Sequence, residues 1–429
     1  MLNRSNPPAI HDAISFDFEL KPCQLTRCFN QIPVYWLQAG TQEVVEVSWV
    51  FKAGIWQEPH TAVAQATAAL LKNGTAHKSA FRLNEAIEYY GASLKTTANN
   101  DFASVTLHAL SKHLPMLLPV VREIITEAIF PEEEVTIYKQ NALQRLAVNL
   151  RQCDFVANRH IDAFVFGRQH PYGRFTEQDN VEALNSAVLN DFHKRFYTAA
   201  NCTIFLSGNF DESNLELLKD NFGKDEWNVQ TGATASIPVY TKMPDAQLKH
   251  RIDNDPNGVQ GAVRIARPFI HRTDPKFAEA LVMNTVFGGY FGSHLMANIR
   301  EDKGFTYGIY SSLISYQQEA MMMIATEAGK EVCEQTVAEV YKEMKIMQEQ
   351  PIDAEELLLV KNYLLGGILG DLDGPFSIMQ RWKNLILNGQ TIEDFHRNIN
   401  IYKSITAERI QELSQEYLNP EQFYELIVV

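Results

Sequence analysis

The sequence predicts an α+β protein with two homologous half-domains, each a mostly antiparallel β-sheet covered by helices. Its 429 residues are too many for one ordinary hydrophobic core. Short runs rich in β-branched and aromatic residues are interspersed with long amphipathic stretches, as in α+β folds. Two local patterns also repeat: the proline-acidic start at 131–134 recurs at 351–356, and the strand at 203–206 resembles 425–428. Their shared offset of about 220 residues favours duplication over chance.

The first half-domain is expected to span 1–225, beginning with an arm of about 30 residues. Asn99, Asn100 and Asp101 lie between two alternating runs, which predicts a hairpin. Thr61 is a plausible N-cap and Gly74 a plausible stop for an Ala/Leu-rich helix. The predicted strands are 33–37, 44–51, 93–97, 102–107 and 202–206, and the predicted helices are 61–73, 79–90, 111–128, 131–150, 154–166 and 181–198.

A linker is expected at 226–245, where the hydrophobic pattern loosens, and the second half-domain at 246–429. This half repeats the order of the first. Its predicted strands are 259–267, 306–310, 321–325 and 424–429, and its predicted helices are 275–287, 332–348 and 353–370, with further helix to 417.

Composition excludes several classes of function. Hydrophobic residues make up 45% and charged residues 21%, which is typical of a soluble globular protein. The net charge of −14 argues against nucleic acid as a partner. No apolar run reaches the roughly 18–20 residues that cross a membrane. The amino end has no apolar h-region, and the five cysteines lack C-x-x-C spacing, so a cytoplasmic protein is expected.

The segment 287–312 combines a glycine-rich turn, a short helix, a second turn at Gly304 and an alternating strand. Arg300 at the helix end and Tyr307 on the strand are seven residues apart across that turn, so a cation and a phenol can converge. From spacing alone, the simpler interpretation is a structural Arg300–Glu301 pair beside a core tyrosine.

This segment resembles the C-terminal half-domain motif of the pitrilysin/insulinase-type zinc peptidases, which include the mitochondrial processing peptidase. The motif residues present are Gly288, Gly289, Ser293, Leu295, Arg300, Glu301, Gly304 and Tyr307. His294 stands where the family has Arg, and Phe305 where it has Leu. The glycine-rich insertion of the non-catalytic mitochondrial subunit is absent. The resemblance implies the processing-peptidase fold, with Arg300 and Tyr307 near the scissile bond and Gly288, Gly289 and Ser293 contributing to substrate binding.

The zinc motif of that family, H-x-x-E-H, is missing. None of the twelve histidines forms an i, i+4 pair, and the nearest approach is His108 and His113. Alignment on the family's trailing G-T places the motif on Gln65, Ala68 and Ala69, and alanine offers neither a zinc ligand nor a proton. The distal carboxylate belongs near 144–146, yet 137–150 holds no acidic residue. No metal is therefore expected in this chain.

Another departure lies on the strand after Gly91, where Lys95 and Thr96 replace the family's Asn-Ala beside bound peptide.

An intact Arg-Tyr motif with an emptied zinc motif resembles the non-catalytic partner in two-subunit members of the family. The implied function is to position peptide substrate and to supply Arg300 and Tyr307 to the zinc site of a homologous partner. No cofactor is expected in this chain, zinc is expected in the partner, and no independent activity is expected. A heterodimer is implied, with a homodimer possible in isolation. Two alternatives stay open: an inert structural or peptide-binding scaffold, and an independent peptidase with unusual ligands.

Overall fold

The computed structural model describes residues 11–227 and 238–429 and contains two β-sheets. The first sheet has six strands in the order β1-β2-β6-β3-β5-β4. Only the β2–β6 pair is parallel, and the other neighbours are antiparallel. Its strands are β1 (Gln24–Arg27), β2 (Pro33–Gln38), β3 (Val44–Phe51), β4 (Ser93–Ala98), β5 (Ala103–Leu110) and β6 (Cys202–Gly208).

The second sheet repeats this arrangement without a counterpart of β1. Its order is β7-β11-β8-β10-β9, and only the β7–β11 pair is parallel. Its strands are β7 (Lys249–Ile252), β8 (Gln260–Pro268), β9 (Thr306–Ser315), β10 (Ala320–Gly329) and β11 (Tyr424–Val428). The predicted α+β fold with two homologous, mostly antiparallel half-domains is confirmed.

The helices follow the same repeat. Those of the first half are α1 (Val63–Leu70), α2 (Ala80–Glu88), α3 (Leu114–Glu127), α4 (Glu132–Asn149), α5 (Cys153–Phe166), α6 (Gln178–Glu182), α7 (Ser186–Phe196) and α8 (Glu212–Gly223). Those of the second half are α9 (Phe277–Asn284), α10 (Cys333–Glu349), α11 (Ala354–Asp371), α12 (Pro375–Leu387), α13 (Ile392–Ser404) and α14 (Ala407–Tyr417). The region predicted as one helix at 181–198 is divided between α6 and α7.

Helices α7 and α14 show how closely the halves match, because both bury the same face. The buried positions of α7 recur in α14 at one constant interval along the chain. They are Leu189, Phe192, His193 and Phe196 in α7, and Ile410, Leu413, Ser414 and Tyr417 in α14.

Thr61 does not cap α1, contrary to the prediction. The residue before α1 is Ala62, whose φ of 81° lies in the left-handed region, and no cap side chain bonds there. The buried carboxylate of Glu58 takes that role instead, accepting a 3.0 Å hydrogen bond from the backbone N–H of Ala64. A side chain six residues upstream therefore satisfies the helix start, which no local capping pattern could indicate.

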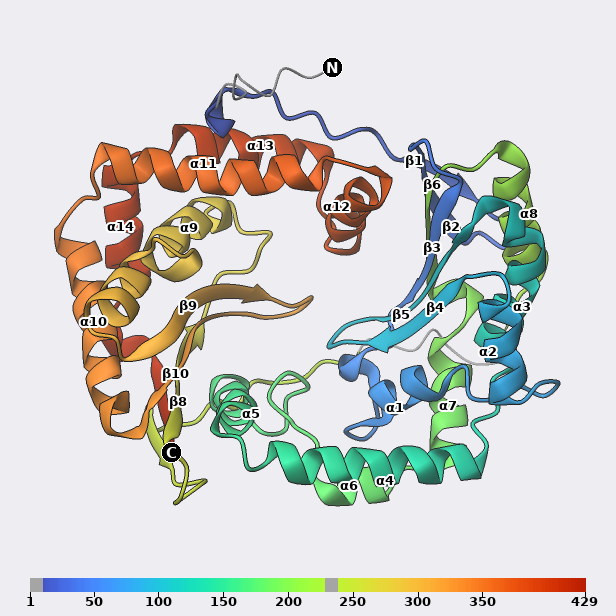
Figure 1. The fold of residues 1–429 in the computed structure, drawn as a ribbon, viewed down its shortest axis with the longest axis horizontal. Coiled ribbons are helices and arrows are strands. Elements are labelled where there is room, and N and C mark those ends of the chain that lie inside the picture. Colours follow the sequence, from blue (N-terminus) through green and yellow to red (C-terminus); the bar gives the residue numbers. More distant parts are fainter. Residues whose placement is uncertain (1–10, 228–237) are drawn as a thin grey trace, which may run out of the picture.

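One helix of each half packs on the sheet of the other half. Helix α5 of the first half packs on β8 and β11, whereas α12 of the second half packs on β2 and β6 (Figure 1). Val156, Ile161 and Val165 of α5 are buried with Leu426 and Val428 of β11. This exchange interlocks the two halves.

The predicted N-terminal arm acts as a strap between the halves. Phe18 and Leu20 are buried in the core of the second half, and the indole N–H of Trp382 in α12 donates to the carbonyl of Lys21 at 2.8 Å. The chain then enters the first sheet as β1. Residues 1–10 of the arm and 228–237 of the predicted linker 226–245 lie outside the described residues.

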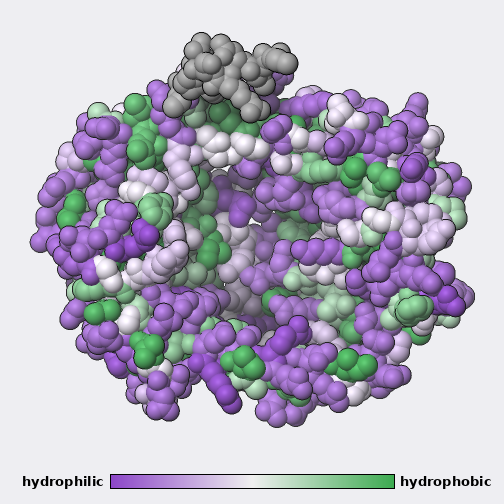
Figure 2. All heavy atoms as spheres, in the orientation of Figure 1, coloured by the Kyte–Doolittle hydropathy of each residue, from purple (hydrophilic) through white to green (hydrophobic). Residues whose placement is uncertain are grey.

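The two halves face each other across a hollow in the surface (Figure 2). The β4–β5 and β9–β10 hairpins point toward each other from opposite sides (Figure 1). Their turns touch where the backbone N–H of Gln317 donates to the carboxylate of Asp101 at 3.2 Å. Within the described ranges, no helix is long and apolar enough to cross a membrane.

Candidate functional site

The glycine-rich turn predicted after α9 lies directly against β9. A π-helical turn, Thr285–Gly289, continues α9. A Cβ at Gly288 would come within 2.8 Å of the Ser311 Cβ on β9, so the backbone can approach the strand this closely only with glycine there. Asn284 fixes the same contact by donating its side-chain N–H to the Ser311 carbonyl at 3.0 Å.

The short helix predicted after this turn is a second π-helical segment, Met296–Asp302. Leu295 and Ile299 are fully buried, as their spacing predicted. The second turn is also confirmed, because Gly304 has a φ of +66° in the left-handed region. The close approach at Gly288 and the burial of Ile299 therefore help to set the position of Arg300 relative to β9.

Arg300 and Tyr307 converge, as their spacing predicted. The Nε–H of Arg300 donates to the backbone carbonyl of Tyr307 at 2.9 Å. The guanidinium lies 4.5 Å from the ring centroid of Phe291 and 5.8 Å from that of Tyr307. Its contact with Glu301 is longer, at 3.5 Å. The aromatic face and the carbonyl together hold the guanidinium plane in one orientation.

Tyr307 is not a core tyrosine, so that part of the simpler interpretation is wrong, whereas the Arg300–Glu301 pair is present. Its side chain is 92% exposed near the start of β9, which is an edge strand of the second sheet. A phenol in this position can donate its hydroxyl to a group outside the chain, such as a developing oxyanion. Arg300 retains N–H donors beyond the one that it gives to Tyr307.

The other predicted substrate-binding residues lie deeper. Ser293 is fully buried, and its backbone N–H donates to the Tyr290 carbonyl at 3.2 Å. Gly288 is buried and Gly289 half-buried. In this conformation all three support the turn before Arg300, and their contact with a substrate stays a prediction.

His294 stands where the family has arginine, and its imidazole is positively charged because it pairs with two glutamates. Its Nδ1 lies 3.2 Å from Glu343 of α10 and its Nε2 lies 3.2 Å from Glu356 of α11. Burial alone would lower the pKa of His294, but the hydrogen bonds to Glu343 and Glu356 raise it to about 9. The imidazolium therefore persists at neutral pH and ties the motif to two helices.

The aligned zinc-motif positions of the first half are on α1, and they do not fit a zinc ion. Gln65 and Ala69 are exposed on one side of the helix, whereas Ala68 is only 2% exposed. Helix α1 contacts α4, the helix expected to carry the distal carboxylate. Alanine has no donor atom, and residues 144–146 of α4 are Gln, Arg and Leu.

The remaining titratable residues near this region do not replace the missing ligands. His108 pairs with Glu46 at 2.8 Å, and His113 packs against the ring of Tyr90 with centroids 5.0 Å apart. Among the residues that the structure describes, no three His, Cys, Asp or Glu side chains are grouped to hold a metal. Lys95 and Thr96 lie on the edge strand β4.

Sequence reasoning missed one unusual carboxyl group beside α1. Burial raises the pKa of Glu58 to about 7, against the opposing effect of the backbone N–H groups at the helix start and of Arg174. No periodicity or motif singles out Glu58, because its role depends on the turn that carries it back under α1.

Comparison with known proteins agrees with this geometry. The family model described as Insulinase (Peptidase family M16) matches residues 34–174, and the model described as Peptidase M16 inactive domain matches residues 183–364. Similar chains include the uncharacterized zinc protease YmxG of Bacillus subtilis, 21% identical over 82% of this chain and 85% of its own length. An uncharacterized zinc protease of Mycobacterium tuberculosis is 22% identical over 82% of this chain and 80% of its own.

Two solved structures show the same fold. The peptidase M16 inactive domain from Pseudomonas fluorescens superposes with a TM-score of 0.82 at 21% identity, covering 95% of this chain and 98% of that one. A protease from Helicobacter pylori superposes with a TM-score of 0.82 at 14% identity, covering 96% of this chain and 100% of that one.

Proposed function

This chain belongs to the insulinase family of peptidases, family M16, and we propose that it is the zinc-free subunit of a two-subunit metallopeptidase that cleaves peptides. Its partner is a homologous chain that carries H-x-x-E-H and the zinc ion. The contrast within one chain supports this proposal: Arg300 and Tyr307 are held together, while Gln65, Ala68 and Ala69 occupy the zinc-motif positions.

The orientation of Tyr307 supports action in trans. Its side chain is 92% exposed on an edge strand, so a site on another molecule can reach the phenol. Peptide hydrolysis passes through a tetrahedral oxyanion, and a preorganised donor to that oxygen contributes roughly 3–4 kcal/mol to transition-state stabilisation. Tyr307 is the proposed donor. Arg300, oriented by Phe291 and the Tyr307 carbonyl, is proposed to hold a substrate carbonyl.

The chain alone is proposed to have no peptidase activity. A metallopeptidase needs an activated water and a general base, and Ala68 at the aligned base position can neither accept nor donate a proton. Activity is expected only when the zinc-bearing chain is added.

The test is reconstitution of this chain with a homologous H-x-x-E-H chain from the same organism, with turnover of a fluorogenic peptide as the readout. Tyr307→Phe removes one hydroxyl, and the expected result is a loss of about 100- to 1,000-fold in kcat with the complex intact by gel filtration. Arg300→Ala is expected to lower kcat/KM by a similar factor. The matched control is Tyr310→Phe, since Tyr310 is also exposed, at 48%, on the same strand.

Unchanged turnover in both the Tyr307 and Arg300 variants would contradict the assigned roles. The inert scaffold makes a different prediction, because it would bind peptides equally well with and without the zinc-bearing chain and would not change that chain's kcat.

A further inference from the structure

A polar pocket of about 410 Å³ lies at the junction between the two halves. It is lined by the turn of the β4–β5 hairpin, the end of β9 with the β9–β10 turn, one side of α12, the loop between β8 and α9 that carries Arg272, and Val50 of β3. We call it the seam pocket. The residues that the argument uses are Asn100, Asp101, Arg272, Gln317, Lys383 and Asn384.

Two partly buried cations line the seam pocket. Arg272 uses one Nη2–H to bond the Ser315 carbonyl at 2.5 Å, while its Nε is buried without a hydrogen-bond partner among the described residues. Lys383 reaches from α12 to the first sheet, where its Nζ donates to the Ser48 hydroxyl at 2.8 Å. That is its only hydrogen bond in the part of the chain that the structure describes, although an ammonium has three donors.

Each of these cations has one carboxylate nearby, and both carboxylates are bonded to other partners. The carboxylate in the pocket wall belongs to Asp101, and its oxygens already accept from the Tyr172 hydroxyl at 2.5 Å and the Gln317 N–H at 3.2 Å. Burial raises the pKa of the Asp101 carboxyl, and the hydrogen bonds from Tyr172 and Gln317 and the charge of Arg272 oppose this shift. Glu46, the carboxylate near Lys383, is paired with His108.

Burial also disfavours the charged form of both cations. It lowers the pKa of Arg272 and of Lys383, with only partial compensation from Asp101 and Glu46 respectively. Guanidinium keeps its charge over the whole physiological range. Both cations nevertheless keep N–H donors that no described residue accepts, and an anion that enters the pocket can accept these hydrogen bonds.

We propose that the seam pocket binds a carboxylate group, and that this carboxylate is the C-terminal end of a peptide. Arg272 and Lys383 supply the charge-assisted hydrogen bonds, and the carboxamides of Asn100, Gln317 and Asn384 line the space for the adjoining peptide groups. The choice of a peptide rests on the proposed peptidase function, whereas the carboxylate rests on the pocket itself. Because the ligand contacts both hairpin turns and α12, its binding stabilises the observed arrangement of the two halves.

The experiment uses the whole chain without any partner and measures binding of N-acetyl tetra-alanine by calorimetry. We expect saturable binding of the free acid, and binding at least about tenfold weaker for the same peptide with a C-terminal amide. Lys383→Met keeps the aliphatic stem and removes the charge, so about tenfold weaker binding of the acid is expected. The matched control is Lys345→Met, an exposed lysine of α10 paired with Glu349.

Equal binding of acid and amide would overturn the proposal, as would unchanged binding in Lys383→Met or no saturable binding at all. Arg272→Gln provides a second variant in case Lys383→Met fails to fold. Acetate as competitor distinguishes the two sources of carboxylate: weak competition assigns the site to a peptide end, and competition as strong as the peptide's assigns it to small carboxylates. Since no zinc-bearing chain is present, failure here is separate from failure of the trans-activation by Tyr307.

Discussion

The two half-domains have the same scaffold and opposite chemical character. Without β1, the sheets share one strand order and one parallel pair, and α7 and α14 bury equivalent faces. Yet the first half has Gln65, Ala68 and Ala69 at the positions where the zinc motif of the family aligns, whereas the second half presents an exposed Tyr307 beside an oriented Arg300. The difference teaches that this fold is maintained by its core, so the chemistry of one half can change without loss of the architecture.

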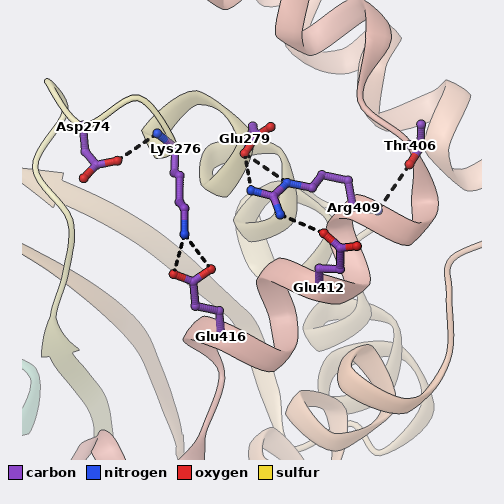
Figure 3. Close-up of polar contacts among 7 residues, drawn as sticks. All are labelled: Asp274, Lys276, Glu279, Thr406, Arg409, Glu412 and Glu416. Carbon is purple, nitrogen blue, oxygen red and sulfur yellow. Dashed lines mark hydrogen bonds and ion pairs between the residues drawn. The ribbon is translucent and has the colours of Figure 1, made fainter.

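Of two equivalent helix pairs, the one in the second half adds ion pairs to the burial that both share. In the first half, α1 packs on α7 and buries six of its eight residues. In the second half, ion pairs link α9 and the residue before it to α14: Lys276 lies 2.9 Å from Glu416, and Arg409 lies 2.8 Å from Glu279 (Figure 3). Within α14, Arg409 also lies 2.8 Å from Glu412. Helix α9 also buries five of its eight residues, so burial contributes most to both pairs, and the partly exposed charges add little to the second.

The largest effect on stability is expected at the contact where α5 of the first half meets the second sheet. The Arg264 side chain is 3% exposed and bonds Asp154, Asn158 and two backbone carbonyls. Arg264→Met leaves these acceptors without a donor, and we expect unfolding free energy to fall by about 3–4 kcal/mol in urea titrations. Arg251→Met is the control, because its ion pairs are exposed and its loss should cost less than about 1 kcal/mol. Equal losses of unfolding free energy in the two variants would contradict the inference that the contact of α5 with the second sheet holds the two halves together.

A pH dependence in the acid range is expected from the first half. Burial lowers the pKa of His193 to about 4, although its bond to the Ile125 carbonyl opposes this shift. The unfolded chain, with a histidine pKa of about 6.5, therefore takes up the proton first. Stability should fall by about 3 kcal/mol as pH drops from about 6.5 to 4. His193→Gln should make the unfolding free energy less dependent on pH in this range. His60→Gln, at an exposed position, should leave that dependence unchanged.

The second half should show the opposite dependence in the alkaline range. The folded pKa of His294 is raised to about 9, so its contribution is complete below the unfolded value of about 6.5 and is lost as pH rises through 9. We expect a loss of about 3 kcal/mol over this window, measured by urea unfolding. In His294→Gln the alkaline slope should shrink. The exposed control His396→Gln should keep the full decrease of unfolding free energy with pH. An undiminished decrease in His294→Gln would contradict the assignment.

The smallest effect is expected at the ion pairs between α9 and α14. Arg409→Ala removes two contacts that are partly exposed to solvent, so we expect a loss of less than about 1 kcal/mol that decreases further in 0.5 M salt. By contrast, Ala66→Gly in buried α1 should cost about 1 kcal/mol or more, independently of salt. A larger, salt-sensitive loss at Arg409 would mean that charge, not burial, holds the second helix pair.

Sequence patterns predicted most elements because their signals are local. Alternation indicated β3 and the β4–β5 hairpin, and amphipathic spacing indicated α4, α10 and α11. Strands β1 and β7 were missed since each has only four residues and mixed polarity. The convergence of Arg300 and Tyr307 was predicted because one turn separates them.

Features that depend on distant segments could not be predicted. The exchange of α5 and α12 between halves, the capping of α1 by Glu58 and the seam pocket all join residues far apart in the sequence. Helical periodicity shows that a helix has an apolar face but not which sheet covers it.

The most direct test of the contrast between the halves is the zinc content of the purified chain after dialysis against a weak chelator. Because Ala68 and Ala69 offer no ligand atoms, the account predicts less than about a tenth of an equivalent per chain. Replacing Gln65 and Ala69 with histidine, Ala68 with glutamate and Leu146 of α4 with glutamate should raise the content if α1 and α4 still form the scaffold of a metal site. Close to one tightly bound zinc ion per unmodified chain would contradict the absence of a zinc site in the first half. It would also contradict the proposal that only the partner subunit carries zinc.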